Sequence, residues 1–267
     1  MTPLTLSIGG ISVRVDSRSQ SLLDQLFEQY RGFTRENVDP GSPAPFDVLV
    51  VMDSGTPPQT HIAPDATFSG DLIIFGLPGF RGTIDPDRSA ELAIASHTPA
   101  RGVDYFLRVV LSALAFRSGG LLLHAAGVVR GRRAFLFFGR SGSGKTTVAR
   151  NSPDDLVLND DLVLLRPENG HWMAYGTPFT NPSQTTPAAG SAPVAALLRL
   201  VQSPRVVLQP LTGARALAEL LACVPVLNAS PAPPLERCRM LLLSIPAYDL
   251  HLRPDSSFWE VIEKIGA

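Results

Sequence analysis

The feature that most constrains this chain is a short glycine-rich stretch between an apolar run and a segment able to open a helix. It reads Gly139-Arg140-Ser141-Gly142-Ser143-Gly144-Lys145-Thr146. The stretch fits the pattern G-x-x-x-x-G-K-[ST], with apolar residues at 134–138 before it and Thr-Val-Ala-Arg at 147–150 after it. A strand, a glycine loop and a helix in this order form the context in which the pattern binds phosphate groups. We therefore expect a phosphate-binding loop (P-loop) here.

Each residue type in the stretch has a physical reason to be there. Glycines let successive backbone N–H groups converge on phosphate oxygens, and a following helix adds a favourable dipole. Lys145 can reach the β- and γ-phosphates, and the Thr146 hydroxyl can ligate Mg²⁺. The cofactors expected are ATP and Mg²⁺. The residues expected to bind the nucleotide are Gly139, Ser141, Gly142, Ser143, Gly144, Lys145, Thr146 and Thr147.

The lysine in this stretch departs from the chain's own usage. Of 23 basic residues, only Lys145 and Lys264 are lysines, and the others are arginines. The larger, rigid guanidinium of arginine does not replace a compact ammonium inside a phosphate loop. The composition thus supports the P-loop interpretation over an ordinary Gly/Ser turn.

Composition also limits the partners. A length of 267 residues allows one large or two modest domains, and the net charge of −1 gives no basic surplus for nucleic acid or an anionic membrane. The N-terminus lacks the pattern of a signal peptide, and no apolar run is long enough to span a bilayer. Cys223 and Cys238 lack metal-ligand spacing, which favours buried free thiols. We expect a cytoplasmic protein without nucleic-acid or membrane partners.

Periodicity divides the chain into two parts. Alternating apolar residues around Gly9-Gly10 predict a β-hairpin, residues 22–30 form one helical face, and residues 46–52 read as a buried strand. Further strands are expected at residues 71–75, 81–84 and 91–96. Apolar positions over 103–114 predict an amphipathic helix, and strands are expected at 121–129 and 133–138. The expected fold is α/β: a small, mostly antiparallel α+β module at 1–98, and a P-loop kinase domain with a mixed sheet at 99–267.

Two adjacent carboxylates, Asp160 and Asp161, follow the loop between two apolar segments. Phosphoryl transfer to a hydroxyl needs one acid group to hold Mg²⁺ and a second to accept the proton. Neighbouring side chains on an extended segment point to opposite sides, so two roles are geometrically natural. The alternative is a polar turn between strands, but the short distance in sequence from the loop favours the catalytic interpretation. His124 lies in an apolar strand, where it is either a satisfied core residue or a polar group near the phosphates or the acceptor.

Together these residues resemble a known family, the HPr kinase/phosphorylase-like proteins, in the stand-alone form found in biosynthetic clusters. Their superfamily also contains the ATP-dependent phosphoenolpyruvate carboxykinases. The similarity extends from about residue 100 to the end. The matching segments are residues 124–129 (HAAGVV), 137–147 (FFGRSGSGKTT), 159–161 (NDD), 176–179 (GTPF) and the tail at 253–259 (RPDSSFW).

The resemblance implies roles for individual residues. Lys145 and Thr146 would bind the triphosphate and Mg²⁺, Asp160 would be the general base, Asp161 a Mg²⁺ ligand, and His124 a nearby polar contact. This chain has no counterpart of the long segment that marks true HPr kinase/phosphorylases, so the resemblance extends neither to HPr as substrate nor to a phosphorylase activity. Where relatives often carry a Gly-Glu pair after the GTPF segment, this chain has Thr-Asn-Pro at 180–182.

The expected function is a kinase that moves the γ-phosphate of Mg-ATP to a hydroxyl of a peptide serine or a small metabolite. One alternative is a nucleotide-binding regulatory ATPase or GTPase that uses hydrolysis as a switch. A second alternative is a carboxykinase-like reaction on an organic acid. The acceptor and the donor base are left open, a homo-oligomer is compatible with the sequence, and the loop at 181–193 either gates the acceptor site or is an ordinary surface loop.

Overall fold

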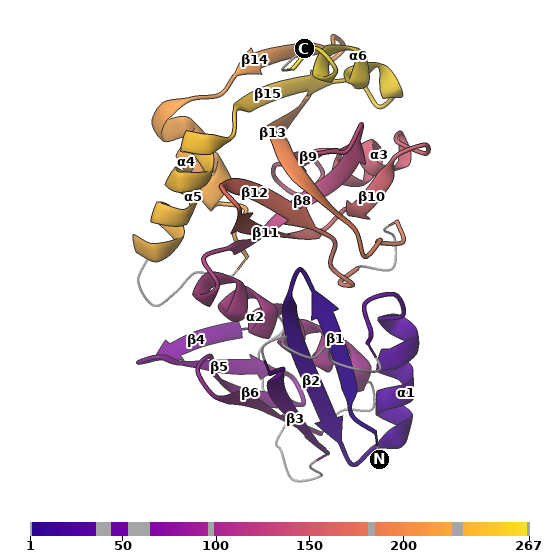
Figure 1. The fold of residues 1–267 in the computed structure, drawn as a ribbon, viewed down its shortest axis with the longest axis vertical. Coiled ribbons are helices and arrows are strands. Elements are labelled where there is room, and N and C mark those ends of the chain that lie inside the picture. The colour runs from indigo at the N-terminus through magenta and orange to yellow at the C-terminus, as the bar shows by residue number, and fades with distance from the viewer. Residues whose placement is uncertain are drawn as a thin grey trace. The chain divides into compact units, whose positions relative to one another are not determined.

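The computed structural model describes residues 2–35, 44–52, 65–95, 99–180, 185–225 and 232–265. The chain forms two compact units, Met1–Arg117 and Ser118–Ala267, each with its own sheet (Figure 1). The expected fold class, α/β with a mixed sheet around the glycine loop and a separate N-terminal α+β unit, is confirmed.

The N-terminal unit is built on a seven-stranded sheet with the order β1-β2-β3-β7-β6-β5-β4. Its strands are β1 (Leu4–Ile8), β2 (Ile11–Ser17), β3 (Phe46–Met52), β4 (Asp65–Ser69), β5 (Leu72–Leu77), β6 (Phe80–Asp85) and β7 (Ser89–Ile94). The predicted hairpin is confirmed: β1 and β2 are antiparallel, and Gly9 and Gly10 turn the chain with φ of 53° and 78°. β3 pairs in parallel with β2 and β7, whereas the other neighbouring pairs are antiparallel, as the expected mostly antiparallel sheet requires.

Two helices pack on this sheet. They are α1 (Gln20–Gln29), which Ser19 caps by accepting a hydrogen bond from the Leu22 N–H, and α2 (Pro99–Arg117). The buried Asp104 of α2 accepts hydrogen bonds from Tyr30 and Gln29 of the α1 region, both at 2.9 Å. Because α2 buries its apolar face in the N-terminal unit, the whole helix belongs to that unit. The chain therefore divides after Arg117, at the end of α2, and not near residue 98 as expected.

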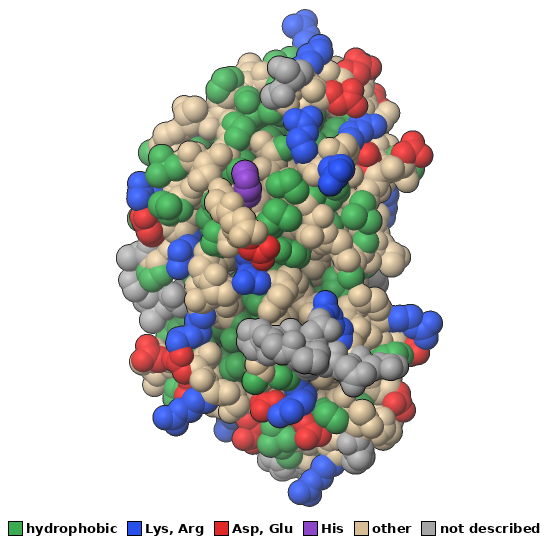
Figure 2. All heavy atoms as spheres, in the orientation of Figure 1, with side chains coloured by type: hydrophobic (Ala, Val, Ile, Leu, Met, Phe, Trp, Pro, Cys, Tyr) green, Lys and Arg blue, Asp and Glu red, His purple; other side chains and the backbone are tan. Residues whose placement is uncertain are grey.

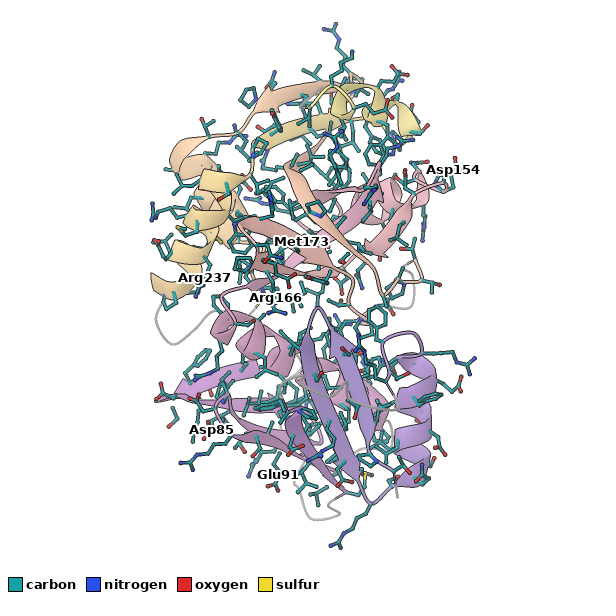
Figure 3. All side chains as sticks on the ribbon, in the orientation of Figure 1. Asp85, Glu91, Asp154, Arg166, Met173 and Arg237 are labelled. Carbon is teal, nitrogen blue, oxygen red and sulfur yellow. The ribbon has the colours of Figure 1, made fainter. Side chains whose placement is uncertain are left out.

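The second unit contains an eight-stranded sheet in which two long strands, β8 and β13, each pair with several others. The strands are β8 (Leu121–Arg130), β9 (Arg133–Phe138), β10 (Leu156–Asn159), β11 (Leu162–Glu168), β12 (His171–Tyr175), β13 (Ser191–Gln202), β14 (Val207–Pro210) and β15 (Ala247–Leu252). Arg166 and Met173 are register partners on β11 and β12 (Figure 3). β9 is antiparallel to β8 and parallel to β13, so the sheet is mixed as expected.

Short helices complete the second unit. They are α3 (Lys145–Arg150), α4 (Gly213–Leu221), α5 (Ala232–Ser244), the 3₁₀ turn η1 (Ser256–Phe258) and α6 (Trp259–Ile262). The tail closes the core next to the strand that leads into the glycine loop, because the rings of Phe137 and Trp259 meet edge to face with centroids 5.7 Å apart. The two cysteines are buried and free, as expected.

Surface features of the described residues bear on the expected partners without testing them. In the part of the chain that the structure describes, no helix combines the length and the apolar character needed to cross a bilayer. Acidic and basic side chains are interspersed on the face shown in Figure 2. The absence of nucleic-acid and membrane partners stays a prediction.

Candidate phosphate and carboxylate site

The glycine loop joins the end of β9 to the start of α3, in the strand, loop and helix order that the sequence predicted. Gly139, Gly142 and Gly144 have φ of 145°, 77° and 113°, a region that residues with a Cβ rarely adopt. At Gly139, an added Cβ would lie 3.1 Å from the Ser143 Oγ and 3.3 Å from its Cβ. Gly139 therefore combines a positive φ with a close approach to the Ser143 side chain, and both conditions favour glycine.

The loop's side chains and backbone remain accessible at its tip. Ser141 and Gly142 are exposed, Ser143, Gly144, Thr146 and Thr147 are partly buried, and Gly139 lies at the buried base. The Ser143 N–H donates to the Arg140 carbonyl at 3.1 Å and tightens the turn. The residues predicted to bind the nucleotide thus form one continuous segment whose tip is exposed to solvent.

Lys145 is folded back onto the loop. Its Nζ donates to the carbonyl oxygens of Gly139 at 3.0 Å and Arg140 at 3.3 Å, and the residue is only 8% exposed. Burial lowers the pKa of Lys145, while the nearby Cys223, Asp161 and Asp160 act in the opposite direction. The glycine loop thus places one buried ammonium near the two buried carboxylates.

The two carboxylates lie at a break between strands. β10 and β11 pair with the same strand, β8, and the register shifts where β10 ends at Asn159. Asp160 and Asp161 occupy this break and are both buried. By contrast, Asp154 in the turn before β10 is exposed, and its side chain extends away from the ribbon in Figure 3. Burial of two adjacent acids is costly unless they have partners, so the break is a candidate functional feature.

Asp160 lies beside the P-loop threonine. Its carboxylate hydrogen-bonds to the Thr146 side chain, and Oδ2 accepts a hydrogen bond from the Thr185 N–H at 3.4 Å. The other oxygen, Oδ1, is buried and has no hydrogen-bond partner among the residues that the structure describes. Burial raises the pKa of Asp160, and the hydrogen bonds from Thr146 and Thr185 offset part of that shift.

Asp161 faces a different partner. Its Oδ1 lies 3.0 Å from the His124 Nε2, and the His124 side chain is 39% exposed. The position of His124 on β8 is fixed by pairing with Leu162 on β11 and by its own N–H, which donates to the Cys223 carbonyl at 2.7 Å. His124 is thus partly exposed and contacts one of the two acids, and its role at the site stays a prediction.

Cys223 is a further neighbour that the sequence did not indicate. The Gly139 backbone hydrogen-bonds to its thiol, and burial raises its pKa. Cys223 follows α4, and Arg199 ties α4 to the sheet by ion pairs to Glu219 at 3.1 Å and to Asp249 at 2.7 Å. The base of the glycine loop is thus packed against a well-anchored helix end.

A cavity of about 310 Å³ adjoins the loop. It is lined by Ser143, Gly144, Thr147, Gln202, Ser203, Leu252, Arg253 and Pro254. The Gln202 Nε2 donates to the Gly142 carbonyl at 2.8 Å, which fixes one wall to the loop. A second cavity, of about 520 Å³, lies between α4, α5 and β15 and contains none of the predicted site residues.

Several residues around this site had no role assigned from the sequence. Asn159, Thr185 and Cys223 contact the predicted residues, and Thr177 contacts Asn159. Asn159 and Thr177 lie in two of the segments that carry the family resemblance. Thr185 and Cys223 come from distant segments with no local signal.

Comparison with known proteins adds little to this geometry. No family model matches the chain, and no curated protein matches it significantly. Among solved structures, it is similar to the Hpr(Ser) kinase/phosphatase from Coxiella burnetii, with 13% identity, 54% of this chain and 92% of that chain covered, and a TM-score of 0.30. At that level of similarity no function is assigned to this chain.

Proposed function

We propose that this protein is a Mg²⁺-dependent kinase that transfers the γ-phosphate of a nucleoside triphosphate to a hydroxyl group. The observation that carries the proposal is the hydrogen bond between Thr146 of the glycine loop and the buried Asp160, with Lys145 close to both acids. A phosphate loop, an ammonium and two acids in one place are the parts that phosphoryl transfer needs.

The loop supplies the phosphate site. Its backbone N–H groups would bind the β- and γ-phosphates, and the Lys145 ammonium, which donates to two loop carbonyls, would donate to phosphate oxygens instead. These interactions neutralise the charge that develops during transfer, which is where positioning and electrostatics contribute most to such reactions.

Mg²⁺ fits the residues present, because the unpartnered Asp160 Oδ1 is a buried carboxylate oxygen of the kind that this ion prefers. Thr146 and Asp160 would hold it. The ion would supply positive charge that neutralises the phosphate oxygens. This allocation reverses the one expected from the sequence, in which Asp161 was the metal ligand, because the contact to Thr146 is made by Asp160.

Asp161 is then the proton acceptor. The acceptor oxygen forms a bond to the γ-phosphorus, the bond from that phosphorus to the β–γ bridging oxygen breaks, the nucleoside diphosphate leaves, and the hydroxyl proton passes to the Asp161 carboxylate. The His124 imidazole, 3.0 Å from Asp161, holds the carboxylate in place. The substrate class is a peptide serine or a small hydroxyl-bearing metabolite.

The cavity beside the loop would take the nucleoside half of the donor. It begins at Ser143, Gly144 and Thr147 and continues to the apolar Leu252 and Pro254. A volume of about 310 Å³ lies within the range of small-ligand sites. The phosphates and the nucleoside would therefore bind in adjoining parts of one unit.

The test is transfer of label from γ-labelled ATP into a fractionated lysate of the source organism. Wild type is compared with Asp161→Asn, which keeps the shape of the side chain but cannot take the proton. Label in one fraction with wild type alone would support the kinase and identify its acceptor. Label released only as free phosphate, equally by both proteins, would overturn the kinase in favour of the nucleotide-hydrolysing switch.

A further inference from the structure

Thr185 lies against the buried acid although it is distant from it in sequence. It belongs to the segment at 185–190, which packs on β10: the Ala188 N–H donates to the carbonyls of Val157 at 3.2 Å and Leu158 at 3.3 Å. This pairing brings the Thr185 N–H to within 3.4 Å of the Asp160 Oδ2. Of the loop expected at 181–193, residues 181–184 lie outside the described residues, Thr185 contacts the acid, and residues 191–193 belong to β13.

Gly176 shows how closely this segment is held. An added Cβ at Gly176 would lie 1.9 Å from the Ala188 carbonyl oxygen and 2.9 Å from that of Leu158, so a side chain would push the segment away from β10. The Gly176 N–H also donates to the Gly190 carbonyl at 3.0 Å. The position of Thr185 over Asp160 is therefore supported by the packing of residues 188–190 against β10 and Gly176.

Two oxygen atoms at this contact have no hydrogen-bond partner among the described residues. They are the Asp160 Oδ1 and the Thr185 Oγ1, and both atoms are buried. Asp160 as a whole is only 1% exposed. Leaving a buried polar atom unpaired costs about 1–3 kcal/mol, and more if the group is charged. Two such atoms on adjoining residues indicate that a ligand of opposite polarity completes the site.

We propose that the Thr185 hydroxyl is an oxygen ligand of the divalent cation, together with Asp160 and Thr146. Mg²⁺ takes oxygen ligands and tolerates few departures from an octahedral arrangement, so hydroxyl and carboxylate oxygens from separate elements suit it. The three residues come from the segment at 185–190, the break between β10 and β11, and the start of α3. The inference rests on the proposed function, because the ion belongs to the same donor site.

The test measures metal binding directly. Mn²⁺ replaces Mg²⁺ as a paramagnetic probe, and its affinity is measured by electron paramagnetic resonance with a non-hydrolysable ATP analogue present. Thr185→Val keeps the shape and the backbone N–H but removes the hydroxyl, whereas Thr185→Ser keeps the hydroxyl. Thr186→Val is the matched control, since Thr186 is the exposed neighbour.

Thr185→Val should weaken Mn²⁺ binding about tenfold or more. The affinity of the analogue measured without metal should not change, and the serine and Thr186 variants should bind Mn²⁺ as wild type does. Equal Mn²⁺ affinity in Thr185→Val and wild type would overturn the assignment of Thr185 while leaving the kinase proposal intact. A wild-type protein that binds neither the analogue nor Mn²⁺ would overturn both.

Discussion

The Asn159 side chain donates from its Nδ2 to the Thr177 carbonyl at 2.8 Å, and this contact links the break beside the acid pair to the segment after β12. The same Nδ2 donates to the Phe179 carbonyl at 2.9 Å, while Oδ1 accepts from the N–H groups of Asp161 at 2.6 Å and Leu162 at 3.0 Å. One fully buried amide therefore bonds to four backbone groups, two at the break and two in the segment after β12.

Replacing Asn159 should loosen the acid pair. Asn159→Ala removes four hydrogen bonds to backbone groups around the buried break, so we expect the free energy of unfolding to fall by about 3 kcal/mol. Hydrogen exchange followed by mass spectrometry should show lost protection at residues 156–165 and 176–179, with the N-terminal unit unchanged. Thr177→Ser is the control, because it keeps the hydroxyl that donates to the Leu162 carbonyl at 2.6 Å. Unchanged protection in Asn159→Ala would show that the amide does not hold the break.

The two lysines provide a matched pair for the nucleotide site. Lys145→Ala should weaken binding of a fluorescent ATP analogue at least tenfold, because a charge-assisted contact to phosphate is worth about 1.5–3 kcal/mol. Lys264→Ala removes the same charge from an exposed position and should bind as wild type does. Equal affinity of the two variants would contradict the assignment of the glycine loop as the phosphate site.

Helices and strands that are determined by neighbouring residues could be predicted from local sequence patterns. The Gly9-Gly10 hairpin and helix α2 follow from alternation and from a 3.6-residue period. β12 was missed although a signal was present, since Asn169-Gly170 is a hairpin dipeptide and both residues have positive φ, 49° and 80°. The glycine loop was predicted because its residue types and spacing are specific, and the acid pair because it follows the loop at a short distance in sequence. The roles of both in phosphate chemistry stay predictions.

Features that depend on packing partners were not predictable in this way. The periodicity of α2 shows that the helix has a buried face but not which sheet covers that face. The boundary between the two units was therefore expected before α2, whereas it lies after this helix. The sequence of residues 256–265 favours one capped terminal helix, but the structure has a 3₁₀ turn and the short α6, in which Phe258 and Trp259 are buried in the core. The contact of Thr185 with Asp160 depends on the pairing of two backbone segments that are distant in sequence.

The packing of α2 on the N-terminal sheet can be tested at Gly102. Alanine in a helix normally stabilises by about 1 kcal/mol relative to glycine. Here a Cβ would lie 1.9 Å from the Phe80 ring, so we expect Gly102→Ala to destabilise the N-terminal unit by about 2 kcal/mol. Hydrogen exchange should show lost protection in β6 and α2 but not in the second unit. Phe80→Leu in the same chain should recover part of the loss, and no recovery would place the strain elsewhere.

In the metal-free protein at neutral pH, the buried Asp160 side chain should lower the free energy of unfolding. Because burial raises its pKa above the ordinary value of 3.8, the folded state binds this proton more tightly than the unfolded state does. The stability contributed by the protonated carboxyl is complete below the unfolded pKa and is lost as pH rises through the folded pKa. At pH 7, Asp160→Asn should therefore melt at a higher temperature than wild type in the presence of a chelator, and the difference should shrink as pH falls below about 4.

Adding Mg²⁺ and a non-hydrolysable ATP analogue should reverse this order. A ligand that binds only the folded state stabilises it according to its concentration relative to Kd, and the asparagine variant loses a carboxylate ligand. Wild type should gain in melting temperature and Asp160→Asn should gain little. Asp154→Asn, at an exposed acid in the turn before β10, is the control and should follow wild type under both conditions. If Asp160→Asn were less stable than wild type with the chelator and equally stabilised by the ligands, Asp160 would be a structural residue, and the metal site would have to lie elsewhere in the chain.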